Sequence, residues 1–115
     1  MNRSLHLTAE LLRRYSRRGN FHSDIDAAAT IGYSRLVAQG MQAAAPAYGL
    51  LLDEWGDGFL AGGTIELKFV GMVVDDETVD ADVELNADSD SDSATISVSV
   101  GDRAVVVGHA TRGTA

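Results

Sequence analysis

The chain has 115 residues, a formal net charge of −8 and no cysteine. This length is typical of one domain, residues 1–115, and the lack of cysteine excludes disulfides, thiolate nucleophiles and cysteine-bound metals. No apolar run approaches membrane-spanning length, so we expect a soluble, cytoplasmic protein with no membrane partner.

Charge is unevenly distributed along the sequence. Six of the nine Arg and Lys residues precede Met41, whereas fourteen of the seventeen Asp and Glu residues follow it. A strongly acidic body argues against non-specific nucleic-acid binding, which needs basic surface to neutralise phosphates. Four arginines are the exception, and they suit either phosphate contacts or a solvated helix end: Arg13, Arg14, Arg17 and Arg18.

Two short helices are predicted in the first third of the chain. Thr8 is a typical N-cap for a helix over Ala9 to Arg17, and Gly19-Asn20 ends that helix. Asp24 opens a second helix that runs through Thr30, because an acidic side chain near a helix start complements the helix dipole.

A longer, buried helix is predicted over residues 39–55, which are rich in Ala and Leu. Pro46 lies inside this segment and cannot donate a backbone hydrogen bond. We therefore expect either a kink or a helix that begins near Pro46, with residues 56–58 (Gly-Asp-Gly) ending it.

After Gly63 the pattern changes to an alternation of apolar and polar residues. This period of two predicts strands over 65–69, 79–85 and 96–100, and Gly101-Asp102 then turns the chain into a strand over 104–107. Four strands after one apolar helix predict an α+β fold in which an antiparallel sheet covers the helix.

Residues 20–41 contain the candidate site. His22 is the one histidine with an amide, Asn20, two residues before it and a carboxylate, Asp24, two residues after it. Gly40 precedes the long apolar run and presents a backbone N–H where an oxyanion is best stabilised. A general base and an oxyanion donor are the minimum for chemistry beside a carbonyl.

The spacing of these residues resembles that of MaoC-like dehydratases, the group that includes (R)-specific enoyl-CoA hydratases. The similar positions are His22, Asp24, Ala28, Gly32-Tyr33 and Val37-Ala38-Gln39-Gly40-Met41, followed by Trp55-Gly56, Gly62-Gly63, Leu67-Lys68-Phe69, Val73, Thr78-Val79, Gly108 and Ala110. The resemblance covers nearly the whole chain. It implies a hot-dog fold, in which an antiparallel sheet wraps around a central helix, and a homodimer with the active site near the subunit boundary.

The same resemblance implies a hydratase or dehydratase that acts on an acyl-CoA or acyl-carrier thioester. His22 would move the proton, and the Gly40 N–H would stabilise the enolate oxygen. Met41 and Tyr48 would line the acyl tunnel, or else form plain core. Contacts to coenzyme A phosphates would come from two arginines, Arg17 and Arg18. Neither a metal nor another cofactor is required.

One element of the family's pattern is missing. The active hydratases carry an aspartate five residues before the histidine, and the residue at that position here is Arg17. If the loop is shorter in this chain, the residue that replaces the aspartate is Asn20 instead. An amide cannot take a proton, although it can orient a water or fix a histidine tautomer. Asp24 is then either the replacement carboxylate or the cap of the next helix. Two alternatives remain: a non-catalytic acyl-CoA-binding subunit of a heteromeric enzyme, and a thioesterase.

The other polar clusters do not indicate a ligand site. Residues 88–93 (DSDSDS) favour an acidic hairpin turn, because they lack the glycine and distal glutamate of an EF-hand loop. His6 and His109 are interpreted as structural or surface residues on other elements than His22, so no metal site is predicted.

Overall fold

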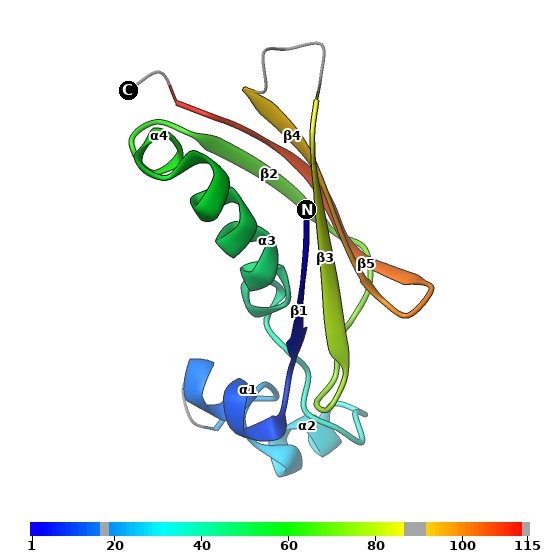
Figure 1. The fold of residues 1–115 in the computed structure, drawn as a ribbon. Coiled ribbons are helices and arrows are strands. Elements are labelled where there is room, and N and C mark those ends of the chain that lie inside the picture. The colour runs from blue at the N-terminus through cyan, green and yellow to red at the C-terminus, as the bar shows by residue number, and fades with distance from the viewer. Residues whose placement is uncertain (17–18, 87–91, 114–115) are drawn as a thin grey trace.

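A five-stranded antiparallel sheet and the helix that it curves around form the body of the molecule (Figure 1). The computed structural model describes residues 1–16, 19–86 and 92–113. The order of the strands in the sheet is β1-β3-β4-β5-β2, and every neighbouring pair is antiparallel. Their bounds are β1 Asn2–His6, β2 Thr64–Phe69, β3 Thr78–Leu85, β4 Ser93–Val100 and β5 Arg103–Thr111. The predicted α+β layout is confirmed.

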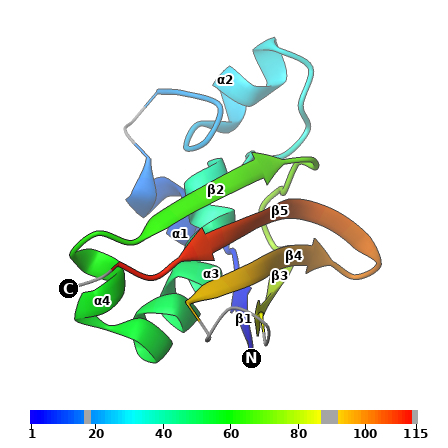
Figure 2. The same ribbon diagram turned by 90° about the horizontal axis from the view of Figure 1, so that it is seen from above.

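The longest helix, α3, packs against the inner face of this sheet, and Figure 2 shows strands β2, β5 and β4 side by side across it. Helices α1 and α2 lie together at the end of the molecule where α3 begins (Figure 1). The helices are α1 Ala9–Tyr15, α2 Ile25–Thr30, α3 Gly40–Trp55 and α4 Asp57–Leu60. Within the described part of the chain, no helix is both long and apolar enough to cross a membrane.

The core lies between α3 and the sheet, because each contributes one apolar face. Along β3 buried residues alternate with exposed ones, as the period of two predicts. Small side chains on the inner face of α3, at Ala43, Ala44 and Ala47, are buried and let the helix backbone approach the strands closely. This close approach fixes where the first turn of α3 lies relative to the sheet.

The helix bounds differ from the predicted ones at two places. Helix α1 ends at Tyr15, two residues early, and Arg17 lies outside the described residues. The idea that the long helix begins near Pro46 is wrong, because α3 begins at Gly40 and contains Pro46 as a buried residue. A proline removes one backbone hydrogen bond, whereas tertiary packing of the flanking Ala and Leu residues stabilises the whole helix.

Strand β1 and helix α4 have no counterpart among the predicted elements. Strand β1 lies at an edge of the sheet with only Leu5 partly buried, so its residues show no apolar alternation. Strand β5 extends to Thr111, four residues beyond its predicted end, because it pairs along its length with β2 as well as β4. The predicted acidic turn lies mostly outside the described residues, which omit 87–91.

The close pairing of β5 with β2 at Gly108 gives a stability prediction. A Cβ at Gly108 would collide with the backbone carbonyl oxygen of Glu66 on the neighbouring strand. Since backbone cannot move aside as a flexible side chain can, Gly108→Ala should cost about 1–3 kcal/mol or more in the free energy of unfolding. Urea denaturation measures this change. Ser97→Ala, on the exposed face of β4, is the matched control and should change stability by less than about 0.5 kcal/mol. Equal stability of the two variants would contradict the steric account.

Candidate active site

Asn20 organises the loop between α1 and α2. Its backbone carbonyl accepts hydrogen bonds from the N–H groups of Ser23 (3.1 Å) and Asp24 (2.8 Å), and its side-chain Oδ1 accepts from the N–H of His22 (2.9 Å). An asparagine side chain that binds the backbone two residues later is typical of an Asx turn. Asn20 therefore positions the backbone of His22.

The imidazole of His22 is held by a backbone carbonyl. Its Nδ1 lies 2.6 Å from the carbonyl oxygen of Val37. A carbonyl oxygen only accepts, so Nδ1 must carry the proton, and Nε2 of the neutral ring then presents a lone pair. The ring also packs on Phe21 at a centroid distance of 3.9 Å. No residue in the described part of the chain forms a hydrogen bond with Nε2. This nitrogen can take a proton from a substrate or a water.

Val37 is the centre of a buried segment, residues 36–38, that we call the connecting segment. The N–H of Val37 donates to the carbonyl of Phe21 (3.2 Å), and the N–H of Ala38 donates to the carbonyl of Val73 (2.8 Å). The segment is therefore bonded to the His22 loop on one side and to the loop after β2 on the other. It leads directly into α3. Three residues span at most about 11 Å, so the carbonyl that holds His22 is near the start of the helix.

Helix α3 begins with two backbone N–H groups that point out of the helix. The N–H groups of Gly40 and Met41 have no acceptor in the part of the chain that the structure describes, and Gln39 is an N-cap without a side-chain cap bond. Unpaired N–H groups and the helix dipole together make this end electropositive. It suits a developing negative charge on a carbonyl oxygen.

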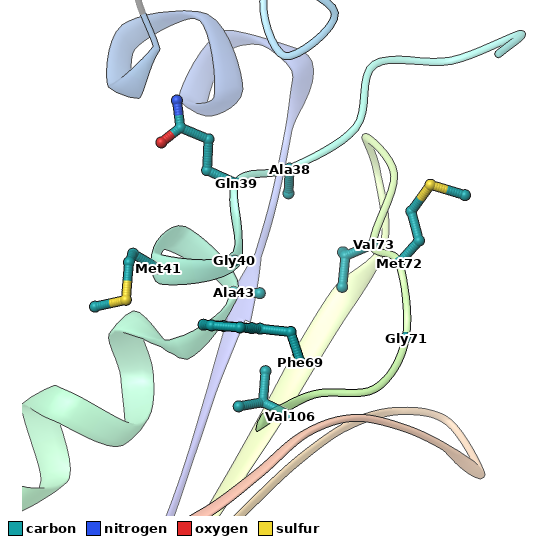
Figure 3. Close-up of a pocket in the computed structure, with 10 residues that line it drawn as sticks. All are labelled: Ala38, Gln39, Gly40, Met41, Ala43, Phe69, Gly71, Met72, Val73 and Val106. Atoms are coloured by element: carbon teal, nitrogen blue, oxygen red, sulfur yellow. The ribbon is translucent and has the colours of Figure 1, made fainter. Parts of the chain in front are cut away.

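A cleft of about 370 Å³ lies between the start of α3 and the end of β2 (Figure 3). Its lining is mainly apolar, and Gly40 lies in it beside the ring of Phe69. The full lining comprises Ala38, Gln39, Gly40, Met41, Ala43, Phe69, Gly71, Met72, Val73 and Val106. An apolar cleft lined at one end by Gly40, whose N–H has no acceptor among the described residues, suits an apolar acyl group with a carbonyl at its end.

The predicted site residues are only partly gathered here. Gly40 and Met41 line the cleft, whereas His22 does not and is linked to it through Val37. Tyr48 is partly buried against the core, with its ring 6.2 Å from that of Phe59, and is also absent from the lining. Two predicted phosphate contacts, Arg17 and Arg18, lie outside the described residues.

The rest of the arginine cluster lines a second hollow, of about 610 Å³, between α1 and the start of α2. Arg13 donates from Nε to the carbonyl of Ser23 (3.3 Å), and Arg14 pairs with Glu10 (2.6 Å) one helical turn away. Both guanidinium groups remain exposed. Part of their hydrogen-bonding capacity is therefore used within the protein.

Asp24 is committed to the helix that follows it. Its Oδ1 accepts from the N–H groups of Asp26 (2.9 Å) and Ala27 (3.3 Å), which makes it the N-cap of α2. The capping role weighed from the sequence is thus confirmed. Among the described residues, no hydrogen bond joins Asp24 to His22.

Two glutamines tie the first turn of α3 to α1. Gln39 donates from Nε2 to the hydroxyl of Ser16 (2.7 Å), and Gln42 donates from Nε2 to the carbonyl of Leu11 (2.9 Å). Gln42 is buried, and its Oε1 has no partner among the described residues. A buried acceptor without a partner costs stability. The packing around Gln42 must offset this cost for its bond to Leu11 to persist. Since Gln39 and Gln42 flank Gly40 in the sequence, both bonds hold the first turn of α3 against α1.

The sequence did not identify the β2 side of the cleft. Phe69 and Val73 were named only as positions that resemble the family's pattern, and neither Gly71 nor Met72 was predicted to lie at the site. The one available signal was the end of the alternation at Phe69, where a strand stops and a loop begins. No three His, Asp or Glu side chains of the described residues lie close enough together to hold a metal ion.

Comparison with known proteins identifies the domain. The family model described as MaoC like domain matches residues 3–107. No curated protein matches the chain. Among solved structures, the (R)-hydratase from A. caviae involved in PHA biosynthesis is similar with a TM-score of 0.73 and 24% sequence identity, over 98% of this chain and 92% of that chain.

Two further structures have the same fold. The R-hydratase PhaJ1 from Pseudomonas aeruginosa, unliganded, aligns with a TM-score of 0.77 and 17% identity over 97% of this chain and 77% of its own. The C-terminally truncated HadBC (3R-hydroxyacyl-ACP dehydratase) complex from Mycobacterium tuberculosis aligns with a TM-score of 0.68 and 18% identity, over 96% of this chain and 90% of that chain. The sheet wrapped around α3 is therefore a hot-dog fold, as predicted.

The cap of α2 can be tested separately from catalysis. Asp24→Asn keeps an oxygen that accepts the two N–H groups, whereas Asp24→Ala removes it. We expect the alanine variant to lose about 1 kcal/mol in the free energy of unfolding and the asparagine variant to stay close to wild type. Urea denaturation of both proteins measures the difference. An asparagine variant as unstable as the alanine variant would show that the charge, not the cap, matters.

Proposed function

This chain belongs to the MaoC-like domain family, and we propose that it is a hydratase or dehydratase of acyl thioesters. The substrate would be an enoyl or 3-hydroxyacyl thioester of coenzyme A or of an acyl carrier. The observation that carries the proposal is the fixed imidazole of His22, whose Nδ1 is bonded to the segment leading into α3. The same segment connects this imidazole to the Gly40 end of α3, which supports the placement of both groups in one site.

In the hydration direction, Nε2 of His22 takes a proton from water while the water oxygen bonds to C3 of the enoyl group. The electron pair of the double bond moves toward the thioester, and the Gly40 N–H stabilises the resulting enolate oxygen. His22 then returns its proton to C2, so water is added and the imidazole is neutral again. The reaction transfers only water and needs no metal or redox cofactor.

The remaining predicted contacts complete this proposal. Met41 lines the cleft and would contact the acyl group, whereas Tyr48 would support it from the core. The exposed guanidinium groups of Arg13 and Arg14, with Arg17 and Arg18 nearby in sequence, suit the phosphates of coenzyme A. Asp24 would support catalysis only by capping α2.

A second candidate function is a binding subunit that completes a heteromeric enzyme. It is favoured by Asn20, whose side chain serves the turn and cannot act as a base. The family's aspartate has no substitute bonded to His22 among the described residues. A lone histidine would then give slow catalysis or none.

Turnover of crotonyl-CoA and longer enoyl-CoAs, followed by loss of the conjugated-thioester absorbance, separates the two candidates. We expect slow hydration by wild type, no activity from His22→Ala, and unchanged or raised activity from Asn20→Asp, because the last restores a proton acceptor near the histidine. His109→Ala, an exposed histidine on β5, is the matched control and should keep wild-type activity. Full activity of His22→Ala would remove His22 from the proposed mechanism, and no wild-type activity at any chain length would favour the binding subunit.

We also propose that two copies form a homodimer. Strands β1 and β2 are the free edges of the sheet, and the apolar side chains of Val70 and Met72 are exposed just beyond β2. A free edge flanked by apolar surface favours pairing with another chain. Light scattering at micromolar concentration should give twice the monomer mass of 12.1 kDa. A monomer under these conditions would count against the homodimer.

A further inference from the structure

The ring of Phe69 lies directly against the first residue of α3. A Cβ placed on Gly40 would be 2.7 Å from Cε1 and 2.8 Å from Cδ1 of that ring, closer than such atoms normally approach. In Figure 3 the ring extends from the end of β2 toward α3, between Ala43 and Val106. Phe69 therefore occupies the space beside the proposed oxyanion donor.

The backbone that carries this ring is fixed. Phe69 pairs with Val106 in the sheet, and the next two N–H groups, of Val70 and Gly71, both donate to the carbonyl of Val105 (2.9 and 3.2 Å). Gly71 cannot gain a side chain without contacting the carbonyl of Ala104 at 2.8 Å. The ring is thus the part that can adjust, and about 50% of the residue's surface is exposed.

The cleft that the ring limits is small. Its volume of about 370 Å³ is near the lower end of the range for ligand pockets, about 300–1,000 Å³. On the opposite side Ala38 and Val73 are buried and joined by a backbone hydrogen bond (2.8 Å), so that wall cannot recede. Among the lining residues, the large apolar side chains are those of Met41, Phe69 and Met72.

We propose that Phe69 is the specificity-determining residue for acyl-chain length and restricts the cleft to short acyl groups. The inference rests on the proposed function, because it takes the thioester carbonyl to lie at the Gly40 N–H. With the carbonyl there, the first carbons of the acyl group lie beside the ring, and a longer chain has to displace it. An aromatic ring has fewer side-chain torsions than methionine, so it makes room for added methylene groups less readily than a flexible methionine does.

The test compares trans-2-enoyl-CoAs of four, six, eight and ten carbons with wild type, Phe69→Ala and Phe69→Leu. Wild type should prefer four carbons. The ratio of kcat/KM for eight carbons to that for four should rise at least tenfold in Phe69→Ala and less in Phe69→Leu. Leu60→Ala is the matched control, because it also truncates a large exposed apolar residue, outside the cleft. A ratio unchanged from wild type in Phe69→Ala would overturn the inference.

Binding separates a failure of this inference from a failure of the proposed function. Saturated acyl-CoAs of the same lengths, titrated by calorimetry, give the corresponding ratio of binding affinities, eight carbons to four, without turnover. A tenfold shift toward eight carbons without any hydration would remove the hydratase function and keep the role of Phe69. Hydration with no shift in the kcat/KM ratio or in the affinity ratio would keep the hydratase function and remove the role of Phe69.

A double-mutant cycle on thermal stability tests the contact itself. Gly40→Ala should lower Tm in the wild-type background, because the new Cβ collides with the ring. In the Phe69→Ala background the same change should lower Tm less or raise it, since alanine is otherwise the better helix residue. Equal effects in both backgrounds would show that Phe69 does not occupy this space.

Discussion

The geometry of the candidate site depends on the connecting segment, residues 36–38. Its carbonyl and N–H groups bind His22 and Phe21 on one side and Val73 on the other. The segment is buried, so breaking these bonds would leave polar backbone groups without water. One short stretch of backbone therefore sets the tautomer of the histidine, the wall of the cleft and the start of α3.

The fold was largely predictable because its elements have strong local patterns. The alternation in β2 to β4 and the Ala-rich run of α3 both reflect which face is buried. Strand β1 was missed because an edge strand with one partly buried residue has no such pattern, and it forms only by pairing with β3. The alternative that the long helix begins near Pro46 was wrong because tertiary packing outweighs the loss of one hydrogen bond.

The site was predictable only where its residues are close in sequence. Asn20, His22 and Asp24 lie in one loop, and the capping role of Asp24 follows from local rules. Phe69 and the loop after it reach Gly40 through the pairing of β2 with β5, a contact that no spacing reveals. The family resemblance located the histidine and the glycine and included Phe69 without a role, and the structure places Phe69 in the wall of the cleft that Gly40 lines.

The most direct test of this account is the protonation of the His22 ring. In ¹⁵N-histidine-labelled protein, long-range ¹H–¹⁵N correlation spectra above the titration range distinguish the two neutral tautomers. The account predicts a protonated Nδ1 and an unprotonated Nε2 for His22, because the Val37 carbonyl can only accept. A proton on Nε2 would mean that the Val37 bond is not formed in solution, and the proposed proton-transfer role would lose its structural basis.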